Sequence, residues 1–184
     1  MPPQRQAVQR YLPFHNHTVM GLFDLFKKPT KIYDNFFGEL RFINSRDSSK
    51  TYFEGKGFFA STQSGTEFLI RAGIQGPTAE QKEFYKALQE NIVQYIQKII
   101  PLIEDEFCNW KEDFTIENFG KEFTLACLTI PRIESRPLMW DMAFTTVHDE
   151  NHHVTIDFID REPNGILIDG QNQRQVTWCC CNRR

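Results

Sequence analysis

The segment 148–153 holds the densest group of side chains in this chain that could do chemistry. It reads His148, Asp149, Glu150, Asn151, His152 and His153. Imidazoles and carboxylates are metal ligands and general acids or bases. Residues 149–151 have the composition of a tight turn between two strands, so His148 and His152 are expected to face each other across it. Two ligands without a clear third favour a solvated hairpin, with a metal site as the alternative.

Other signs of catalysis are absent from the sequence. The chain has no Gly-x-Ser-x-Gly elbow, no His-Glu-x-x-His helix and no pair of Cys-x-x-Cys motifs. Asp141 and Asp157 interrupt apolar strand patterns, where each is either a carboxylate with a shifted pKa or an ordinary solvent-facing residue. We therefore expect no catalytic residue, no metal ligand and no cofactor. The alternative function is a small metal-dependent hydrolase that uses the hairpin of His148 and His152.

A better candidate for binding is the acidic run Glu104, Asp105 and Glu106, which Trp110 follows closely. Acidic side chains next to an aromatic residue can complement a basic protein, and their field speeds its association. The plain alternative is a solvated helix end. These four residues are the predicted protein-binding site.

One long helical pattern organises the chain around residues 78–110. Thr78 and Gln81 have the spacing of a capping box, which marks a helix start. Apolar residues then recur with the helical period at Phe84, Leu88, Ile92, Tyr95, Ile96, Ile99, Ile103 and Phe107. Pro101 removes a backbone donor, and the acids at 104–106 suit the first turn of a new helix. The pattern thus predicts two helical segments that meet at Pro101.

Strand patterns flank this helix on both sides. Three precede it, at 36–43, 51–60 and 66–72, and three or four follow, at 122–130, 138–148, 152–160 and 165–168. Gly55 and Gly57 indicate either a bulge or a close approach of a neighbour. Short connections favour antiparallel pairing. The predicted fold is α+β, with antiparallel strands packed around one long, Pro-kinked central helix.

The totals exclude some classes of partner. A net charge of −3 over 184 residues gives no basic footprint for nucleic acid. No run approaches the ~20 apolar residues of a membrane span. The five cysteines make no disulfide framework, and residues 1–19 do not read as a signal peptide, so a cytoplasmic location is expected.

The domain organisation follows from where patterns begin and end. Residues 1–19 have no periodicity and read as a disordered tail or a mis-assigned start, since Met20 opens a natural-looking N-terminus. Residues 20–170 are predicted to form a single α+β domain. Residues 171–184 read as a second disordered tail.

Several aromatic motifs carry a resemblance to known families. The runs 32–40 and 52–55, Gly76-Pro77-Thr78 and 156–158 resemble uncharacterised bacterial domains of unknown function. Members of that group look like immunity proteins, which neutralise the toxins of neighbouring cells. The resemblance spans about residues 20–170 and supplies no catalytic residue. It implies a non-enzymatic binding protein of a bacterial cytoplasm with a toxin as its protein partner, and the acidic run favours a basic toxin.

Overall fold

The computed structural model describes the backbone of residues 30–170 and the side chains of residues 30–168. Both predicted tails therefore lie outside the described residues. The elements before the long helix are β1 (Lys31–Asp34), β2 (Gly38–Ile43), a 3-10 turn (Ser48–Lys50), β3 (Tyr52–Phe59) and β4 (Ser64–Ile70). The helix is α1 (Ala79–Phe107), and after it come α2 (Phe119–Glu122), β5 (Phe123–Ile130), β6 (Met139–Thr146), β7 (Asp149–Ile159) and β8 (Glu162–Gly170).

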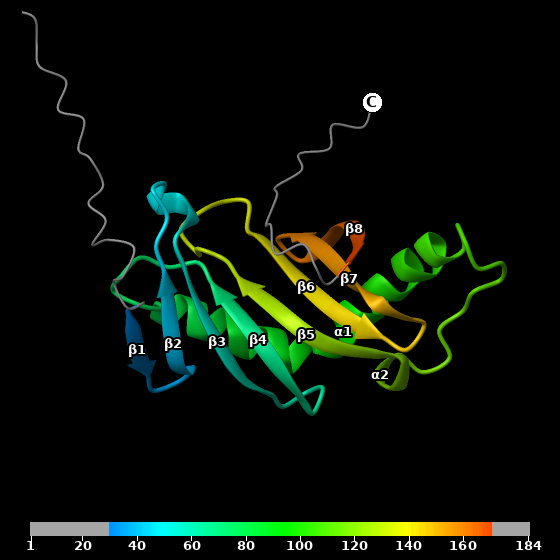
Figure 1. Cartoon of the computed structure of the whole chain (residues 1–184), viewed down its shortest axis with the longest axis horizontal. Helices are drawn as coiled ribbons and strands as arrows, with labels where there is room; N and C mark the ends of the chain where they lie inside the picture. Colours follow the sequence, from blue (N-terminus) through cyan, green and yellow to red (C-terminus); the bar gives the residue numbers. More distant parts are fainter. Residues whose placement is uncertain (1–29, 171–184) are drawn as a thin grey trace, which may run out of the picture.

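All the strands belong to one eight-stranded sheet, and α1 lies against one face of it (Figure 1). The strands follow one another across the sheet in chain order, from β1 to β8. Neighbours joined by a short connection pair antiparallel, whereas β4 and β5 pair parallel. The helix explains this exception, because a crossover through α1 returns the chain to the end of the sheet at which β4 began.

The prediction of antiparallel strands packed around a central helix is therefore wrong. The sheet is mixed, it has four strands on each side of α1 in the sequence, and the helix covers one face only. The missed strand is β1, whose four residues are too few to show an alternating pattern. It is the edge strand beside β2.

The expected interruption at Pro101 is also wrong, because α1 runs without a break from Ala79 to Phe107. Pro101 is exposed, while Ile99 and Ile103 on either side of it are fully buried. Proline in a helix interior costs about 3 kcal/mol, and burying two isoleucines contributes about as much or more. Burial of the continuous apolar stripe therefore keeps the helix intact through Pro101.

The start of α1 is fixed by Gln81. The backbone N–H of Gln81 donates to the Thr78 hydroxyl at 3.3 Å, and the Thr78 N–H donates to Gln81 Oε1 at 3.0 Å, which confirms the capping box. Gln81 Nε2 then donates to the carbonyl oxygens of Arg71 at 2.9 Å and Pro131 at 2.8 Å. These residues follow β4 and β5, so one buried side chain ties the helix to both parallel strands.

The core between α1 and the sheet is rich in aromatic rings. Tyr85 is 5% exposed and makes edge contacts with Phe37, Phe59 and Phe68 at centroid distances of 5.4–5.6 Å. The sequence pattern missed Tyr85, and it placed Ile96 in the core although that residue is only partly buried. The buried stripe is therefore rotated slightly from the expected one.

The two glycines of β3 allow a close approach and form no bulge. The pairing of β3 with β4 is continuous past Gly55 and Gly57. A Cβ at Gly57 would lie 2.6 Å from the ring of Phe68, and one at Gly55 would meet the side chain of Leu40. Large side chains of the neighbouring strands occupy the space that the glycines leave.

We predict that Gln81→Ala lowers the free energy of unfolding by about 2–4 kcal/mol, since it removes half of the cap and leaves two buried carbonyl oxygens without their donor. Urea denaturation measures the change. The matched control is Gln97→Ala on the exposed side of the same helix, which should stay within about 0.5 kcal/mol of the parent protein. Equal effects of the two substitutions would contradict this role of Gln81.

Leu88→Ala should cost roughly 2–5 kcal/mol, because Leu88 is 2% exposed and the substitution leaves a cavity between α1 and the sheet. Val93→Ala, at a position 63% exposed on the same helix, is the comparison and should change stability little. A loss below about half a kilocalorie for Leu88→Ala would mean that this face of α1 does not pack on the sheet.

Candidate functional site

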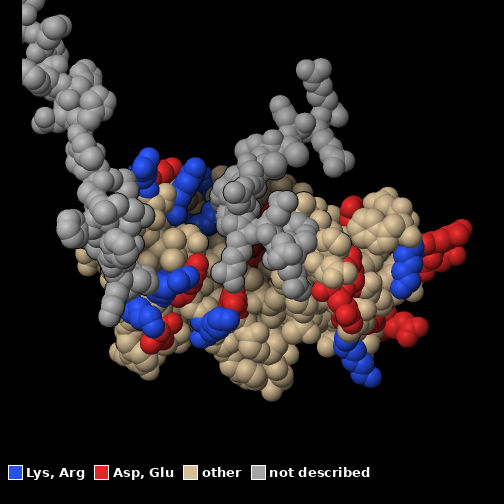
Figure 2. Space-filling view, in the orientation of Figure 1, with Lys and Arg blue, Asp and Glu red and all other residues tan. Residues whose placement is uncertain are grey.

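The end of α1 and the connection after it concentrate negative charge. We name residues 104–122 the acidic end. It contains seven acidic residues and two lysines, a formal net charge of −5, whereas the whole chain carries −3. In Figure 1 the last turns of α1 and this connection extend to the right-hand end of the molecule, and Figure 2 shows acidic side chains gathered there.

The predicted binding residues Glu104, Asp105, Glu106 and Trp110 all lie in this region. Glu104 is half-buried and accepts a hydrogen bond from the Ile116 N–H at 2.8 Å, so it holds the connection against the helix. Asp105 is exposed. The indole of Trp110 is 57% exposed and contacts the ring of Phe107 at 5.4 Å. Asp105 and Trp110 are therefore the members of the group that present themselves to solvent.

The position of these acids is electrostatically unfavourable for the helix. They occupy the last turn of α1, which contains no basic residue. The C-terminus of a helix carries partial negative charge, so acids there cost stability. Because of this conflict, the sequence pattern predicts that a second helix begins at Pro101, which the structure does not show. Residues that break a local stability rule are found mostly at functional or strained sites.

A cluster of aromatic rings packs against the residues of the acidic end. Phe107 and Phe114 are both buried, and their rings stack with centroids 4.7 Å apart. The His148 ring meets Phe114 edge-on at 4.9 Å. Lys111 Nζ lies 5.0 Å from the centroid of the Phe114 ring, which is a cation–π distance. Trp110 thus packs on Phe107, whose ring is itself held by the stacking contact with Phe114.

His148 belongs to this region and does not face His152. The β6–β7 turn lies at residues 147–148, because Thr146 already pairs with Asp149, so the expected turn at 149–151 is wrong. His148 Nε2 lies 2.7 Å from Glu122 Oε2. A hydrogen bond from the Asn118 N–H, together with His148, lowers the pKa of Glu122.

His152 has a carboxylate of its own. Its Nδ1 lies 2.7 Å from Asp149 Oδ2, three residues earlier in the chain. Within the part of the chain that the structure describes, no group of three or more His, Cys, Asp or Glu side chains is placed to hold a metal ion. The two histidines therefore form separate pairs, His148 with Glu122 of α2 and His152 with Asp149 of β7.

A second charged cluster lies on the sheet face opposite α1. Asp141 and Asp157 are cross-strand partners on β6 and β7, and Thr129 Oγ1 donates to Asp141 Oδ1 at 2.9 Å. Burial raises the pKa of Asp141 to about 6, although Thr129 and the charge of Arg71 act to lower it. For Asp141 this favours the shifted carboxylate of the two interpretations offered by the sequence, whereas Asp157 is exposed to solvent.

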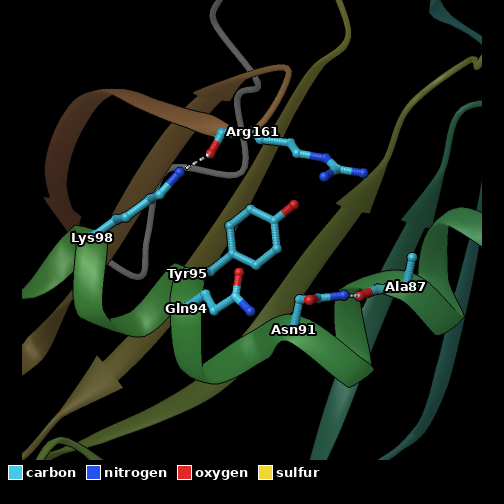
Figure 3. A pocket seen from close by; sticks show the side chains of 6 residues that line it. All are labelled: Ala87, Asn91, Gln94, Tyr95, Lys98 and Arg161. Atoms are coloured by element: carbon cyan, nitrogen blue, oxygen red, sulfur yellow. Dashed lines mark hydrogen bonds between the residues drawn. The ribbon is translucent and has the colours of Figure 1, made fainter.

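One further feature gave no signal in the sequence. A hollow beside α1 is lined by Ala87, Asn91, Gln94, Tyr95, Lys98 and Arg161 (Figure 3). Asn91, Gln94 and Lys98 read as an ordinary polar helix face, Tyr95 reads as part of the apolar stripe, and Arg161 comes from the β7–β8 turn. Only the folded chain brings them together.

Comparison of the chain with protein-family models, with curated proteins and with solved structures finds no match. Among the described residues, α1 is the one long helix, and it is too polar to cross a membrane. The functional argument therefore rests on the geometry above.

We predict that Asp141→Asn stabilises the protein at neutral pH. The folded-state pKa of about 6 exceeds the ordinary 3.8, so between these values the folded state binds more protons than the unfolded state. The free energy of unfolding therefore falls as the pH rises through this window. Asparagine removes that loss and keeps an acceptor for Thr129. The gain should be on the order of 1 kcal/mol at pH 7 after allowance for solvent screening, and near zero at pH 4.

Thermal denaturation at both pH values measures the difference between the variants. Glu90→Gln, at an exposed position of α1, is the control and should give the same small change at each pH. A lower melting temperature of Asp141→Asn at pH 7 would mean that attraction to Arg71 outweighs the cost of burial.

Proposed function

We propose that this protein is a non-enzymatic binding protein whose acidic end engages a basic protein partner. The observation that carries the proposal is the formal charge of −5 on residues 104–122, which exceeds the charge of the whole chain. A field concentrated at one end steers an oppositely charged partner toward that end and raises the rate of association.

An exposed aromatic anchor accompanies this charge. Trp110 is 57% exposed and stands on the packed rings of Phe107 and Phe114. Val147, in the turn next to His148, is 65% exposed, and its N–H donates to the Glu122 carbonyl at 3.1 Å. Tryptophan is enriched among the residues that contribute most to protein–protein affinity. A rigid aromatic residue among acids suits a partner that presents lysine or arginine beside apolar surface.

The more specific form of the proposal is an immunity protein that acts in a bacterial cytoplasm and neutralises a basic toxin. Its support is the resemblance of the aromatic motifs to bacterial domains of the immunity type, together with the acidic end. A toxin that binds nucleic acid or phosphorylated substrates needs a basic surface, and an acidic protein can cover such a surface.

The metal-dependent hydrolase is not carried further. His148 and His152, which it would use, are each engaged with a separate carboxylate at 2.7 Å. No observation on the described residues favours that reaction.

The proposal is tested by single charge reversals on the exposed surface of one helix. Asp105→Lys should slow association with a basic protein partner by roughly tenfold at low salt, since it removes part of the steering field. Glu90→Lys changes the net charge equally at an exposed position two turns or more before the acidic end, and should have little effect. The advantage of the parent protein should shrink toward physiological salt, where exposed charges are screened beyond ~8 Å.

Stability provides an independent readout of the same variants. Asp105→Lys places a cation at the helix C-terminus, so its melting temperature should stay equal or rise. Trp110→Ala should chiefly speed dissociation, as expected for an anchor residue. Normal binding by both variants, with loss of binding in His152→Gln, would refute the acidic end as the binding site.

A further inference from the structure

The hollow beside α1 lies between the middle of the helix and the β7–β8 turn. It encloses about 50 Å³, which is space for one small chemical group. Figure 3 shows the Tyr95 hydroxyl and the Arg161 guanidinium on the same side of this hollow, with Gln94 and Asn91 along the helix beneath them. The lining contains two cations and no acid.

Some of the lining groups already have partners. Lys98 Nζ donates to the Arg161 carbonyl at 3.2 Å and to Glu162 Oε1 at 2.6 Å. Asn91 Nδ2 donates to the Ala87 carbonyl at 2.7 Å. The bonds from Lys98 hold the β7–β8 turn, and with it the backbone of Arg161, against the helix.

Three donors of the lining are left unused. Among the described residues, the Arg161 guanidinium, the Tyr95 hydroxyl and the Gln94 amide make no hydrogen bond or ion pair. The Tyr95 ring is held in place by edge contacts with Trp140 at 5.4 Å and Phe158 at 5.7 Å. Its hydroxyl is therefore a donor held in place beside an exposed cationic side chain, and neither has an acceptor among the described residues.

The charges in this region favour an anion. Lys98 is balanced by Glu162, so Arg161 leaves the site with a net charge of +1. Burial and the charge of Glu162 raise the pKa of Tyr95, while the charges of Arg161 and Lys98 lower it, so the two cations and this one acid all lie within electrostatic range of the hydroxyl. A guanidinium presents paired donors that match the two oxygens of a carboxylate or a phosphate.

We propose that this hollow binds one small oxyanion group, a carboxylate or a phosphate, between Arg161, Tyr95 and Gln94. The guanidinium supplies the charge and two donors, the tyrosine hydroxyl supplies a fixed third donor, and the glutamine amide completes the shell. The size of the hollow limits the ligand to a single group of this kind, free or at the end of a larger molecule.

This site is separate from the acidic end. Its residues lie at 87–98 and 161, outside residues 104–122, and it attracts charge of the opposite sign. Failure of one proposal leaves the other intact.

The test is a titration of the full, ¹⁵N-labelled chain followed by nuclear magnetic resonance. Sodium phosphate and sodium acetate are the two probes, and sodium chloride at equal ionic strength is the blank. The side-chain signals of Gln94 and Asn91 and the Arg161 Nε–H should shift and saturate with Kd on the order of 1 mM, a value within reach of ligands of about four or five heavy atoms. Whichever probe binds more tightly identifies the ligand class.

Two variants separate a built site from general attraction to positive charge. Arg161→Gln should weaken binding about tenfold, because it removes the charge-assisted hydrogen bonds, and Tyr95→Phe should weaken it less. Arg136→Gln is the matched control, since this exposed arginine lies 3.9 Å from Asp160 and outside the lining. It should leave the affinity unchanged.

Three results would overturn the proposal. They are the absence of saturable shifts with both probes, equal shifts with chloride, and equal losses in Arg161→Gln and Arg136→Gln. Chemical shifts of the backbone report folding of each variant in the same spectra, so a loss of binding in a folded Arg161→Gln protein supports the site directly.

Discussion

Gln81 makes the interaction on which the arrangement of helix and sheet depends. Its side-chain oxygen caps the start of α1, and its side-chain nitrogen donates to the carbonyl oxygens of Arg71 and Pro131. These carbonyls end the two parallel strands, β4 and β5, at the centre of the sheet. A buried amide must have its hydrogen bonds satisfied, and here a single side chain satisfies itself only if helix and both strands are in place together. The aromatic core around Tyr85 then fills the space that this junction defines.

The C-terminal end of α1, unlike its start, has unfavourable electrostatics. Its apolar stripe continues to Phe107, but its last turn carries acids without a compensating cation, against the preference of the helix dipole. Stability is concentrated at the helix start, and charge is concentrated at the helix end. The hollow at Tyr95 lies between them, where Lys98 fastens the β7–β8 turn to the helix. One helix thus carries the junction, the hollow and the acidic end in sequence order.

The sequence was informative where local chemistry decides the structure. The capping box at Thr78 and Gln81, the helical stripe and seven of the eight strands follow from spacing alone, at least in outline. It failed where tertiary packing overrides a local rule. Pro101 does not interrupt α1, because Ile99 and Ile103 are buried on both sides of it. The parallel pairing of β4 with β5 depends on a crossover through the helix, which no short-range pattern encodes.

The candidate sites divide in the same way. The acidic run and Trp110 are visible in the sequence because they are contiguous, whereas Arg161 joins Tyr95 only through the β7–β8 turn. The prediction that His148 faces His152 failed because the turn between β6 and β7 lies at other residues than expected. A shift of the turn to residues 147–148 gave His148 to Glu122 and left His152 with Asp149. A shift of one turn by two residues was enough to separate His148 from His152.

The strand order has a consequence for how the chain folds. Because the sheet follows chain order, β1 to β4 form one antiparallel meander and β5 to β8 form another, each from contacts between near neighbours in sequence. Such local pairings close short loops and form quickly. Among the strand pairings of the described sheet, only that of β4 with β5 joins residues separated by the whole helix. Closing so long a loop costs more entropy than closing the short turns, so we expect this pairing to form after those within each meander.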